Sequence, residues 1–349
     1  MDIPNTMKAA ILVKQDSDLI VDDIELPRIL DIGQVFVKLN VSGICGSQLG
    51  EIEGRKGIDP YLPHLMGHEG CGEVLKIGPG VKTVSVGDKV VLHWKKGSGI
   101  QSETPKYKWR GKTLNAGWVT TFNEYAIISE NRCTSIPKNI NNDDAALFGC
   151  AVTTAFGVVE NNAKLRFGES VLVCGAGGIG LNIIQASKLI SAWPIIAVDI
   201  YDNRLKLAKN FGATHIINSQ KEDLELAVNK IIKEKSLDVF IDNTGMPNII
   251  EKGYELINNK GRVILVGVPP KDSHIKIYSL PLHFGKIILG SHGGECVPEV
   301  DIPRYLKLLA NKKINFEGLI TSRFSLNDIN IAINTMRSGS SSGRIMIDL

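Results

Sequence analysis

The residues VLVCGAGGIG, numbers 171–180, say most about the architecture of this chain, because an apolar run leads directly into a glycine-rich turn. The turn GAGGIG fits the GxGxxG pattern, which binds a dinucleotide pyrophosphate when it joins a strand to a helix. Apolar residues then recur at steps of 4, 3 and 4 along one helical face: Ile179, Ile183, Ala186 and Ile190. We therefore predict a strand, a tight turn and a helix between residues 171 and 190.

Three glycines have separate roles in this hypothesis. Gly175 permits the tight turn, Gly177 lets the pyrophosphate approach the backbone, and Gly180 allows the helix to pack closely on the strand. Asp199 closes the next apolar run, where a carboxylate can accept hydrogen bonds from ribose hydroxyls and repel a 2′-phosphate. The pattern favours NAD over NADP; the alternatives are a glycine turn without a ligand and an aspartate that only caps a helix.

Five more apolar strand candidates follow the first: 195–199, 215–219, 238–244, 261–267 and 286–291. Helix-length patterns separate the first five of the six, and strands alternating with helices predict a doubly wound parallel sheet. Such sheets bind ligands where their strands end. The candidate cofactor-binding residues are therefore Gly175, Gly177, Gly178, Gly180, Asp199, Arg204, Thr244, Val266 and Val268.

The chain has a different rhythm from residue 7 to about 140, where short β-rich runs are separated by Gly and Pro. This spacing predicts a small barrel or sandwich. A chain of 349 residues is long enough for two domains, and the tail from about 295 returns to a helical pattern before it ends in a strand candidate, RIMIDL.

Composition argues against several classes of protein. A hydrophobic content of 43% with 22% charged residues is that of a globular chain, and a net charge of +3 argues against nucleic acid or a membrane surface as the main partner. We expect neither a signal peptide nor a membrane helix, because no basic, apolar leader and no long uninterrupted apolar stretch is present. Six cysteines without a pairing pattern favour reduced thiols and a cytoplasmic protein.

Two cysteines and a histidine are candidate metal ligands: Cys45 in GICGS, His68 in GHEG and Cys150 in GCAVTT. Zinc prefers thiolate and imidazole, and three protein ligands leave a fourth position open, as in catalytic zinc sites. Nothing in the spacing shows that the three meet. Taken singly, each is more often a buried structural residue than a metal ligand.

The ordered motifs GICGS, GHEGCGEV, GDKVV, GCAVTT and VLVCGAGGIG resemble those of the medium-chain, zinc-dependent alcohol and polyol dehydrogenases over essentially the whole chain. The resemblance implies that Cys45, His68 and Cys150 bind a catalytic zinc, with Glu69 beside the metal and able to serve as a fourth ligand. A zinc ion in such a site acts as a Lewis acid on the alcohol or carbonyl oxygen.

The same resemblance implies an α/β architecture with a GroES-like β-barrel catalytic domain at residues 1–152 and 295–349, and a Rossmann NAD-binding domain at 153–294. It implies that Ser47 hydrogen-bonds the reacting oxygen and that Arg344 contacts the cofactor pyrophosphate.

Two positions depart from the family pattern. Gln48 stands where many relatives carry an aspartate that orients the zinc-bound histidine, and Gly50 stands where alcohol-oxidising relatives often carry a histidine that relays the proton. An amide can still orient an imidazole, although it raises ligand basicity less than a carboxylate does. The proton must then leave by another route, such as water, the cofactor ribose or a different side chain.

The stretch HWKKGSGIQSETPKYKWRGK, residues 93–112, stands where many relatives bind a second, structural zinc with four cysteines. No Cys occurs between Cys71 and Cys133, so we expect one catalytic zinc per chain and no structural zinc. The resemblance places Trp94 in the substrate pocket. The basic residues beyond it fit a solvated loop, a lid for an anionic substrate or, least well, a nucleic-acid patch.

These observations predict a zinc- and NAD-dependent dehydrogenase that acts on the alcohol or carbonyl of a polyol, sugar or related small molecule, including an anionic or phosphorylated one. The alternatives are a metal-free quinone or enoyl reductase and a non-catalytic NAD(H)-binding protein. We expect no nucleic-acid partner and no membrane partner. The resemblance implies a homodimer or homotetramer.

Overall fold

The computed structural model describes residues 3–233 and 237–349 and divides into two compact units. Unit 1 comprises Met1–Cys150, Val297–Lys312 and Ile320–Leu349, and unit 2 comprises Ala151–Cys296 and Lys313–Leu319. Compared with the expected boundaries, residues 313–319 of the tail belong with the second unit. There the backbone N–H of Asn315 donates to the side chain of Gln185 at 2.9 Å.

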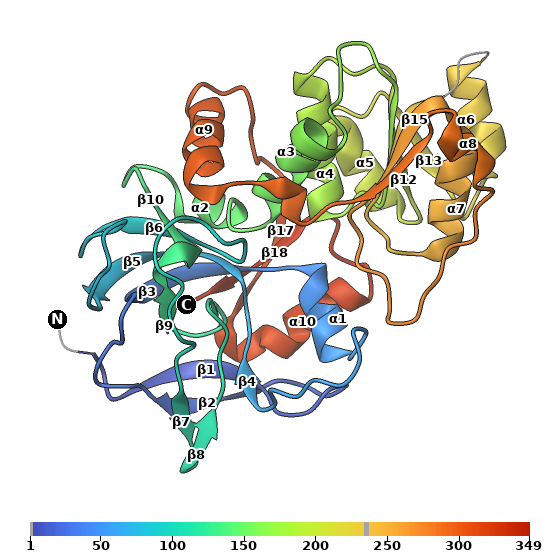
Figure 1. The fold of residues 1–349 in the computed structure, drawn as a ribbon. Coiled ribbons are helices and arrows are strands. Elements are labelled where there is room, and N and C mark those ends of the chain that lie inside the picture. Colours follow the sequence, from blue (N-terminus) through green and yellow to red (C-terminus); the bar gives the residue numbers. More distant parts are fainter. Residues whose placement is uncertain (1–2, 234–236) are drawn as a thin grey trace. The chain divides into compact units, whose positions relative to one another are not determined.

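Unit 1 is built on two sheets of mostly antiparallel strands (Figure 1). The first has the order β4–β1–β2–β7–β8: His64–Leu65, Thr6–Leu12, Ile20–Glu25, Tyr107–Trp109 and Lys112–Leu114. The second has the order β10–β6–β5–β3–β18–β17: Cys133–Ile136, Lys89–His93, Glu69–Ile77, Gln34–Ile44, Arg344–Asp348 and Ile320–Ser325. Strand β9, Tyr125–Ser129, also pairs with β3.

The tail of the chain completes the second sheet. Strand β18 pairs antiparallel with β3, with Ile345 opposite Ile44 and Ile347 opposite Ser42. Both isoleucines of β18 are fully buried. The helical segments of unit 1 are α1 (Gly46–Ile52), η1 (Glu130–Arg132), α2 (Asn142–Leu147), α9 (Pro298–Ala310), η4 (Leu326–Asp328) and α10 (Ile329–Arg337).

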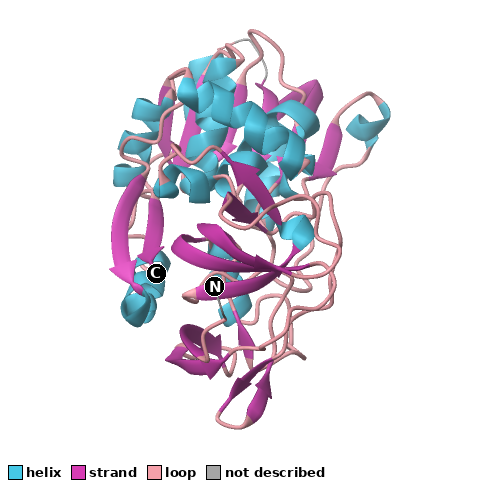
Figure 2. Cartoon of the chain, turned by 90° about the vertical axis from the view of Figure 1, so that its left-hand side faces the viewer, coloured by secondary structure: helices cyan, strands magenta, loops and turns pink. Residues whose placement is uncertain are grey.

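Unit 2 contains a six-stranded parallel sheet with the order β13–β12–β11–β14–β15–β16: His215–Asn218, Ile195–Asp199, Val171–Cys174, Leu237–Asp242, Ile257–Leu265 and Ile287–Gly290. This is the strand order of a Rossmann sheet, in which the order reverses beside the first strand. Figure 2 shows that this unit is rich in helix, whereas unit 1 is mostly strand and loop. The predicted doubly wound parallel sheet and the predicted strand-rich catalytic unit are both confirmed.

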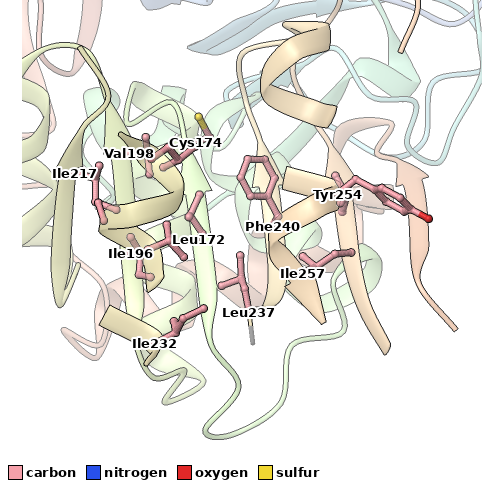
Figure 3. Close-up of a cluster of buried hydrophobic side chains, with 14 of the residues drawn as sticks. Leu172, Cys174, Ile196, Val198, Ile217, Ile232, Leu237, Phe240, Tyr254 and Ile257 are labelled. Atoms are coloured by element: carbon pink, nitrogen blue, oxygen red, sulfur yellow. The ribbon is translucent and has the colours of Figure 1, made fainter. Parts of the chain in front are cut away.

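The helical segments of unit 2 are α3 (Ala151–Gly157), η2 (Val158–Asn162), α4 (Gly178–Leu189), α5 (Asp202–Phe211), α6 (Leu224–Ile232), α7 (Pro247–Leu256), α8 (Leu280–His283) and η3 (Gly293–Glu295), and α4 to α8 lie between strands of the sheet. On one side of the sheet, alternate strand residues such as Leu172, Ile196 and Phe240 are fully buried beneath helices α6 and α7 (Figure 3). The burial of these apolar side chains stabilises the sheet, and with it the end of β11 where the glycine turn begins.

No helix in the described parts of the chain is long and apolar enough to cross a membrane. Even α9, with 13 residues, is shorter than the roughly 20 apolar residues that a span needs.

Candidate functional site

The three predicted zinc ligands come together in unit 1, although they are far apart in the sequence. Cys45 immediately precedes α1, His68 immediately precedes β5, and Cys150 lies just after α2. Their ligand atoms all lie within 4.8 Å of one another, and the two Sγ atoms are 3.9 Å apart. Both cysteines are buried and His68 is half-buried. The fold therefore gathers a Cys–His–Cys tripod that sequence spacing alone could not show.

Gln48 positions the first of these ligands. Its side-chain Oε1 accepts a hydrogen bond from the backbone N–H of Cys45 at 3.4 Å, and its own N–H donates to the Cys45 carbonyl at 3.0 Å. A glutamine at the third helical position that reaches back in this way caps the start of a helix. Ser47 lies half-buried in the same first turn. Gln48 thus caps the helix that follows Cys45, a role that the family comparison with aspartate did not suggest.

The electrostatics of the tripod favour a thiolate. Contact with the Cys150 thiol, together with the nearby His68 and the Arg344 guanidinium, holds the pKa of Cys45 well below its ordinary value, even though burial acts in the opposite direction. A deprotonated thiol is the form that binds metal. None of the six cysteines forms a disulfide within the described ranges, and all six are buried.

Glu69 and Arg344 form a buried ion pair behind this cluster. Glu69 is 0% exposed, Arg344 is 3% exposed, and their side chains are in contact. Gly43 is required there, because a Cβ at that position would lie 2.1 Å from Oε1 of Glu69. Gly149 is required as well, because its Cβ would lie 2.9 Å from the Cα of Glu69. The glycines of the GIC and FGC motifs therefore make room for this carboxylate.

Arg344 lies in β18 and belongs to this charged cluster. Burial lowers its pKa, whereas attraction to Cys45 acts against that effect. The sequence analysis placed this arginine against a cofactor pyrophosphate, but its described contact is with Glu69. Sequence reasoning had no signal for the pair, because the two residues are distant in the chain and meet only through the pairing of β18 and β5 with β3.

The donor set fits zinc. Two buried sulfurs, one with a depressed pKa, and one imidazole are the ligand types that zinc prefers, and a three-ligand site leaves a coordination position for a water or substrate oxygen. Glu69 is not part of the cluster in which ligand atoms lie within 4.8 Å of one another.

A cavity of about 420 Å³ opens beside His68 within unit 1. Its lining includes Gln48 from α1, Trp118 from the segment before β9, and Thr104 and Lys106 from the basic stretch 93–112. Trp118 is an aromatic lining residue that the sequence analysis missed, because no motif or spacing singles it out. Trp94, the predicted pocket residue, does not line this cavity; its carbonyl accepts a hydrogen bond from Arg132 at 2.6 Å.

The basic stretch is anchored to the barrel and ends in a hairpin of β7 and β8. The carboxylate of Glu130 accepts the N–H groups of Ile100 at 2.7 Å, Lys82 at 2.6 Å and Thr83 at 2.8 Å. Burial acts to raise the pKa of Glu130, but these three donors outweigh it and the pKa is lowered. Of these three donors Ile100 belongs to the stretch, so Glu130 binds the stretch to η1 at that residue.

Two basic side chains of the stretch have partners within unit 1. Arg110 forms an ion pair with Asp22 at 2.9 Å, and Lys106 donates to the side chain of Asn115 at 2.9 Å. His93, at its start, is buried, and its two ring nitrogens contact the Lys95 carbonyl and the Thr134 hydroxyl. Burial lowers the pKa of His93 to about 4, so this histidine is neutral and structural.

In unit 2 the glycine turn has the expected geometry. Gly175 has a φ of +89°, which favours glycine, and a Cβ at Gly180 would lie 2.0 Å from the Gly175 carbonyl oxygen. Gly177 caps α4, and a Cβ there would meet nothing within 4 Å, so this side of the turn is open. Gly178 is the first residue of α4. A turn that opens into a helix N-terminus is suited to bind a pyrophosphate.

Asp199 ends β12 beside this turn. Its carboxylate accepts the N–H of Ala176 at 2.8 Å and those of Ile200 and Tyr201, so it helps to shape the turn. Arg204 lies close by, with its guanidinium 3.8 Å from the same carboxylate. The acid therefore has a structural role in addition to the predicted contact with ribose.

The strand ends of β14 and β15 contribute a buried acid that the sequence analysis missed. Asp242 is 0% exposed and accepts the N–H and hydroxyl groups of Thr244 and the N–H of Gly245. Burial raises its pKa, although these hydrogen bonds act against the rise. Val266 is half-buried and Val268 is 50% exposed. Thr244 is thus fixed by Asp242 at the edge where such a sheet binds its ligand.

Comparison with known families gives two matches. The alcohol dehydrogenase GroES-like domain matches residues 31–138, and the zinc-binding dehydrogenase family matches residues 178–311.

Individual relatives cover nearly the whole chain. Alcohol dehydrogenase 6 of Peromyscus maniculatus is 30% identical, with 95% of each chain covered. S-(hydroxymethyl)glutathione dehydrogenase of Paracoccus denitrificans is 28% identical, with 88% of this chain and 91% of the relative covered. Among solved structures, benzyl alcohol dehydrogenase from Acinetobacter calcoaceticus superposes with a TM-score of 0.89 at 28% identity and covers 99% of this chain and 100% of its own.

Proposed function

The chain belongs to the zinc-containing alcohol dehydrogenase family, and from this premise we propose that it transfers a hydride between NAD(H) and the alcohol or carbonyl group of a polyol, sugar or related small molecule. The observation that carries the proposal is the meeting of Cys45, His68 and Cys150 beside a cavity in unit 1. A zinc ion held there would supply Lewis-acid polarisation of the substrate oxygen.

Other residues of the chain would bind the reacting oxygen, support the metal ligands and bind NAD. In this proposal Ser47 hydrogen-bonds the reacting oxygen, and the buried Glu69–Arg344 pair supports the metal ligands from behind. NAD would lie on the turn of Gly175, Gly177, Gly178 and Gly180, with Asp199 at the ribose and with Arg204, Thr244, Val266, Val268 and Arg344 as further candidate contacts. NAD supplies the hydride acceptor when it is bound.

We propose one zinc per chain. The support is the absence of Cys between Cys71 and Cys133, which leaves the stretch 93–112 without the thiolates of a structural zinc, together with the anchoring of Ile100 in that stretch by Glu130. Metal analysis of purified protein should give one zinc. Replacement of Cys45 by Ala should remove the zinc and abolish turnover while NADH binding is retained. Zinc well below one per chain would favour a metal-free reductase or a nucleotide-binding protein.

The cavity guides the choice of substrate. Its charged lining includes the carboxylates of Glu51 and Asp59 and the ammonium of Lys106, with an apolar wall that includes Leu65 and Trp118. With His64 beside them, two carboxylates and two basic groups leave no excess of positive charge that would favour a phosphorylated substrate over a neutral, hydroxylated one. A screen of NAD⁺ reduction with matched polyols and polyol phosphates tests this; preference for the phosphates would support the anion lid instead.

We also propose a homodimer or homotetramer joined through β16. This strand ends the parallel sheet, and exposed apolar side chains lie on it and just before it, including Tyr278 at 69%, Phe284 at 70% and Ile287 at 45%. An open strand edge with such side chains is suited to pair with a second copy. Light scattering after size-exclusion chromatography should show two or four chains, and a monomer would contradict the proposal.

A further inference from the structure

One wall of the cavity carries a histidine that is held at both ring nitrogens. Nδ1 of His64 lies 2.9 Å from the carbonyl oxygen of Leu65, and Nε2 lies 2.8 Å from Oδ2 of Asp59. A second carboxylate, that of Glu51, lies 4.0 Å from the same Nε2. The His64 side chain is only 8% exposed, whereas that of Glu51 is 44% exposed. His64, Asp59 and Glu51 therefore connect a buried imidazole with a carboxylate that reaches solvent.

The atoms that face the two ring nitrogens of His64 bear on which of these nitrogens carries a proton. A carbonyl oxygen and an ionised carboxylate can only accept, so both contacts are hydrogen bonds when each ring nitrogen of His64 carries a proton. The imidazolium form satisfies both partners. Loss of the Nε2 proton would leave a lone pair facing the Asp59 oxygen. A transferable proton is thus held between His64 and Asp59, next to an acid that reaches solvent.

The proposed reaction needs a group that can accept and release a proton. Oxidation of an alcohol releases the hydroxyl proton into the cavity that contains His68, and this chain has Gly50 at the position of the relay histidine of many relatives. Gln48 lines the cavity but, as an amide, it does not accept a proton at neutral pH.

The other titratable groups lining the cavity are less suited to this task. They are Tyr61, His68 and Lys106. His68 is a candidate metal ligand, and phenol and ammonium groups ordinarily keep their protons at pH 7. An imidazole is the side chain that most readily exchanges a proton near neutral pH. Only His64, with its two carboxylate neighbours, combines that chemistry with a place in the cavity wall.

We propose that the His64–Asp59 pair is the proton-exchange group of this cavity and that Glu51 is its outlet; the inference rests on the proposed dehydrogenase function. During oxidation the Nε2 proton passes to the Glu51 carboxylate and on to solvent. The proton released as the alcohol O–H bond breaks then reaches Nε2 through water in the cavity. The pair ends in its starting protonation state, and the electron pair leaves as hydride to NAD⁺. Asp59 acts as a positioning residue, because it holds the ring and its proton.

Chemical rescue tests the exchange step in the zinc-loaded enzyme. His64→Ala should lower kcat for alcohol oxidation by about 100-fold in dilute, non-imidazole buffer, the lower end of what general acid–base groups contribute. Added imidazole should restore at least about tenfold of that loss, and zinc content and NADH affinity should stay unchanged. His274→Ala, which removes an exposed histidine of unit 2, is the matched control and should show neither loss nor rescue. Glu51→Gln should make turnover depend on buffer concentration.

Two results would overturn the proposal: a kcat of His64→Ala within twofold of the wild type, or a loss in folded, zinc-loaded protein that neither imidazole nor buffer changes. Nitrogen-15 NMR of histidine-labelled protein gives a readout independent of turnover. In the proposed pair both ring nitrogens of His64 carry protons, and Asp59→Asn should leave Nε2 unprotonated. An unprotonated Nε2 in the wild type would refute the pair and fit a bound cation instead. If the wild type oxidises no alcohol, the proposed function fails, while the NMR result still decides the state of the pair.

Discussion

Substitution of Glu130 tests whether its hydrogen bonds stabilise the segments next to the cavity. Its carboxylate accepts three backbone N–H groups, from Lys82, Thr83 and Ile100. Glu130→Gln keeps one carbonyl oxygen and turns an NH₂ group toward at least one of these donors. A hydrogen bond to a charged group contributes about 1.5–3 kcal/mol. Loss of one or two, with partial relaxation, should lower the free energy of unfolding by about 2–4 kcal/mol.

The effect should reach the cavity along a chain of hydrogen bonds. The Ile100 carbonyl accepts the hydroxyl of Ser129 at 2.9 Å, and the same hydroxyl oxygen accepts the N–H of Ser102 at 2.8 Å. The Ser102 carbonyl in turn accepts the indole N–H of Trp118 at 3.1 Å, and Trp118 lines the cavity. Glu130→Gln should therefore raise KM several-fold with a smaller effect on kcat and none on zinc content.

Guanidinium denaturation followed by tryptophan fluorescence measures the stability change. Glu73→Gln on the exposed face of β5 is the control and should stay within about 0.5 kcal/mol of the wild type. The pKa of Glu130 is lowered from its ordinary 4.5, so its contribution is complete above that pH and is lost as the pH falls through the folded-state value. The difference between variant and wild type should shrink accordingly. Equal stability of Glu130→Gln and wild type at pH 7 would refute the reasoning.

Two other predictions concern His93 and Asp199. The pKa of buried His93 is lowered from 6.5 to about 4. As the pH falls, His93 is therefore protonated in the unfolded chain before it is protonated in the folded one. The free energy of unfolding should decrease by roughly 3 kcal/mol as the pH falls from 6.5 to 4. His93→Gln should flatten this part of a denaturation–pH profile, and an unchanged slope would assign the acid sensitivity elsewhere. Asp199→Asn removes the charge that repels a 2′-phosphate, so the ratio of kcat/KM for NAD to that for NADP should fall about tenfold. Steady-state kinetics with both coenzymes checks this, and a constant ratio would remove Asp199 as the selector.

The nucleotide unit could be predicted well because its signals are local. The apolar runs at 171–174 and 195–199 are strands, and the glycine turn joins β11 to α4 as expected. Strand β15 is the exception, since it begins at Ile257 rather than near Gly261. Its pairing with β14 changes register between Leu237 and Val239. Such an irregularity depends on how two strands meet, so no periodicity within either strand could reveal it.

The catalytic unit shows where sequence reasoning stops. Residue chemistry marked Cys45, His68 and Cys150 as zinc-type ligands, but 105 residues separate the two thiols, and only the family resemblance indicated that they converge. The pocket aromatic was expected at Trp94, whereas Trp118 lines the cavity beside His68. His64 went unnoticed because its importance depends on Asp59 and Glu51, which approach it only in the folded chain.

If the chain binds one zinc, as we propose, the stretch 93–112 must be held in place without a second metal. Thiolates would hold a metal-bound lobe together, whereas in this chain the carboxylate of Glu130 binds the N–H of Ile100 in the stretch and those of Lys82 and Thr83 before it. The two devices respond to different conditions. Removal of the metal by a chelator would loosen a metal-bound lobe. Protonation of Glu130 should loosen the stretch 93–112, because the neutral acid lacks the charge that strengthens its three hydrogen bonds. The hydrogen bonds that lead from Glu130 to Trp118 should therefore weaken when Glu130 is protonated.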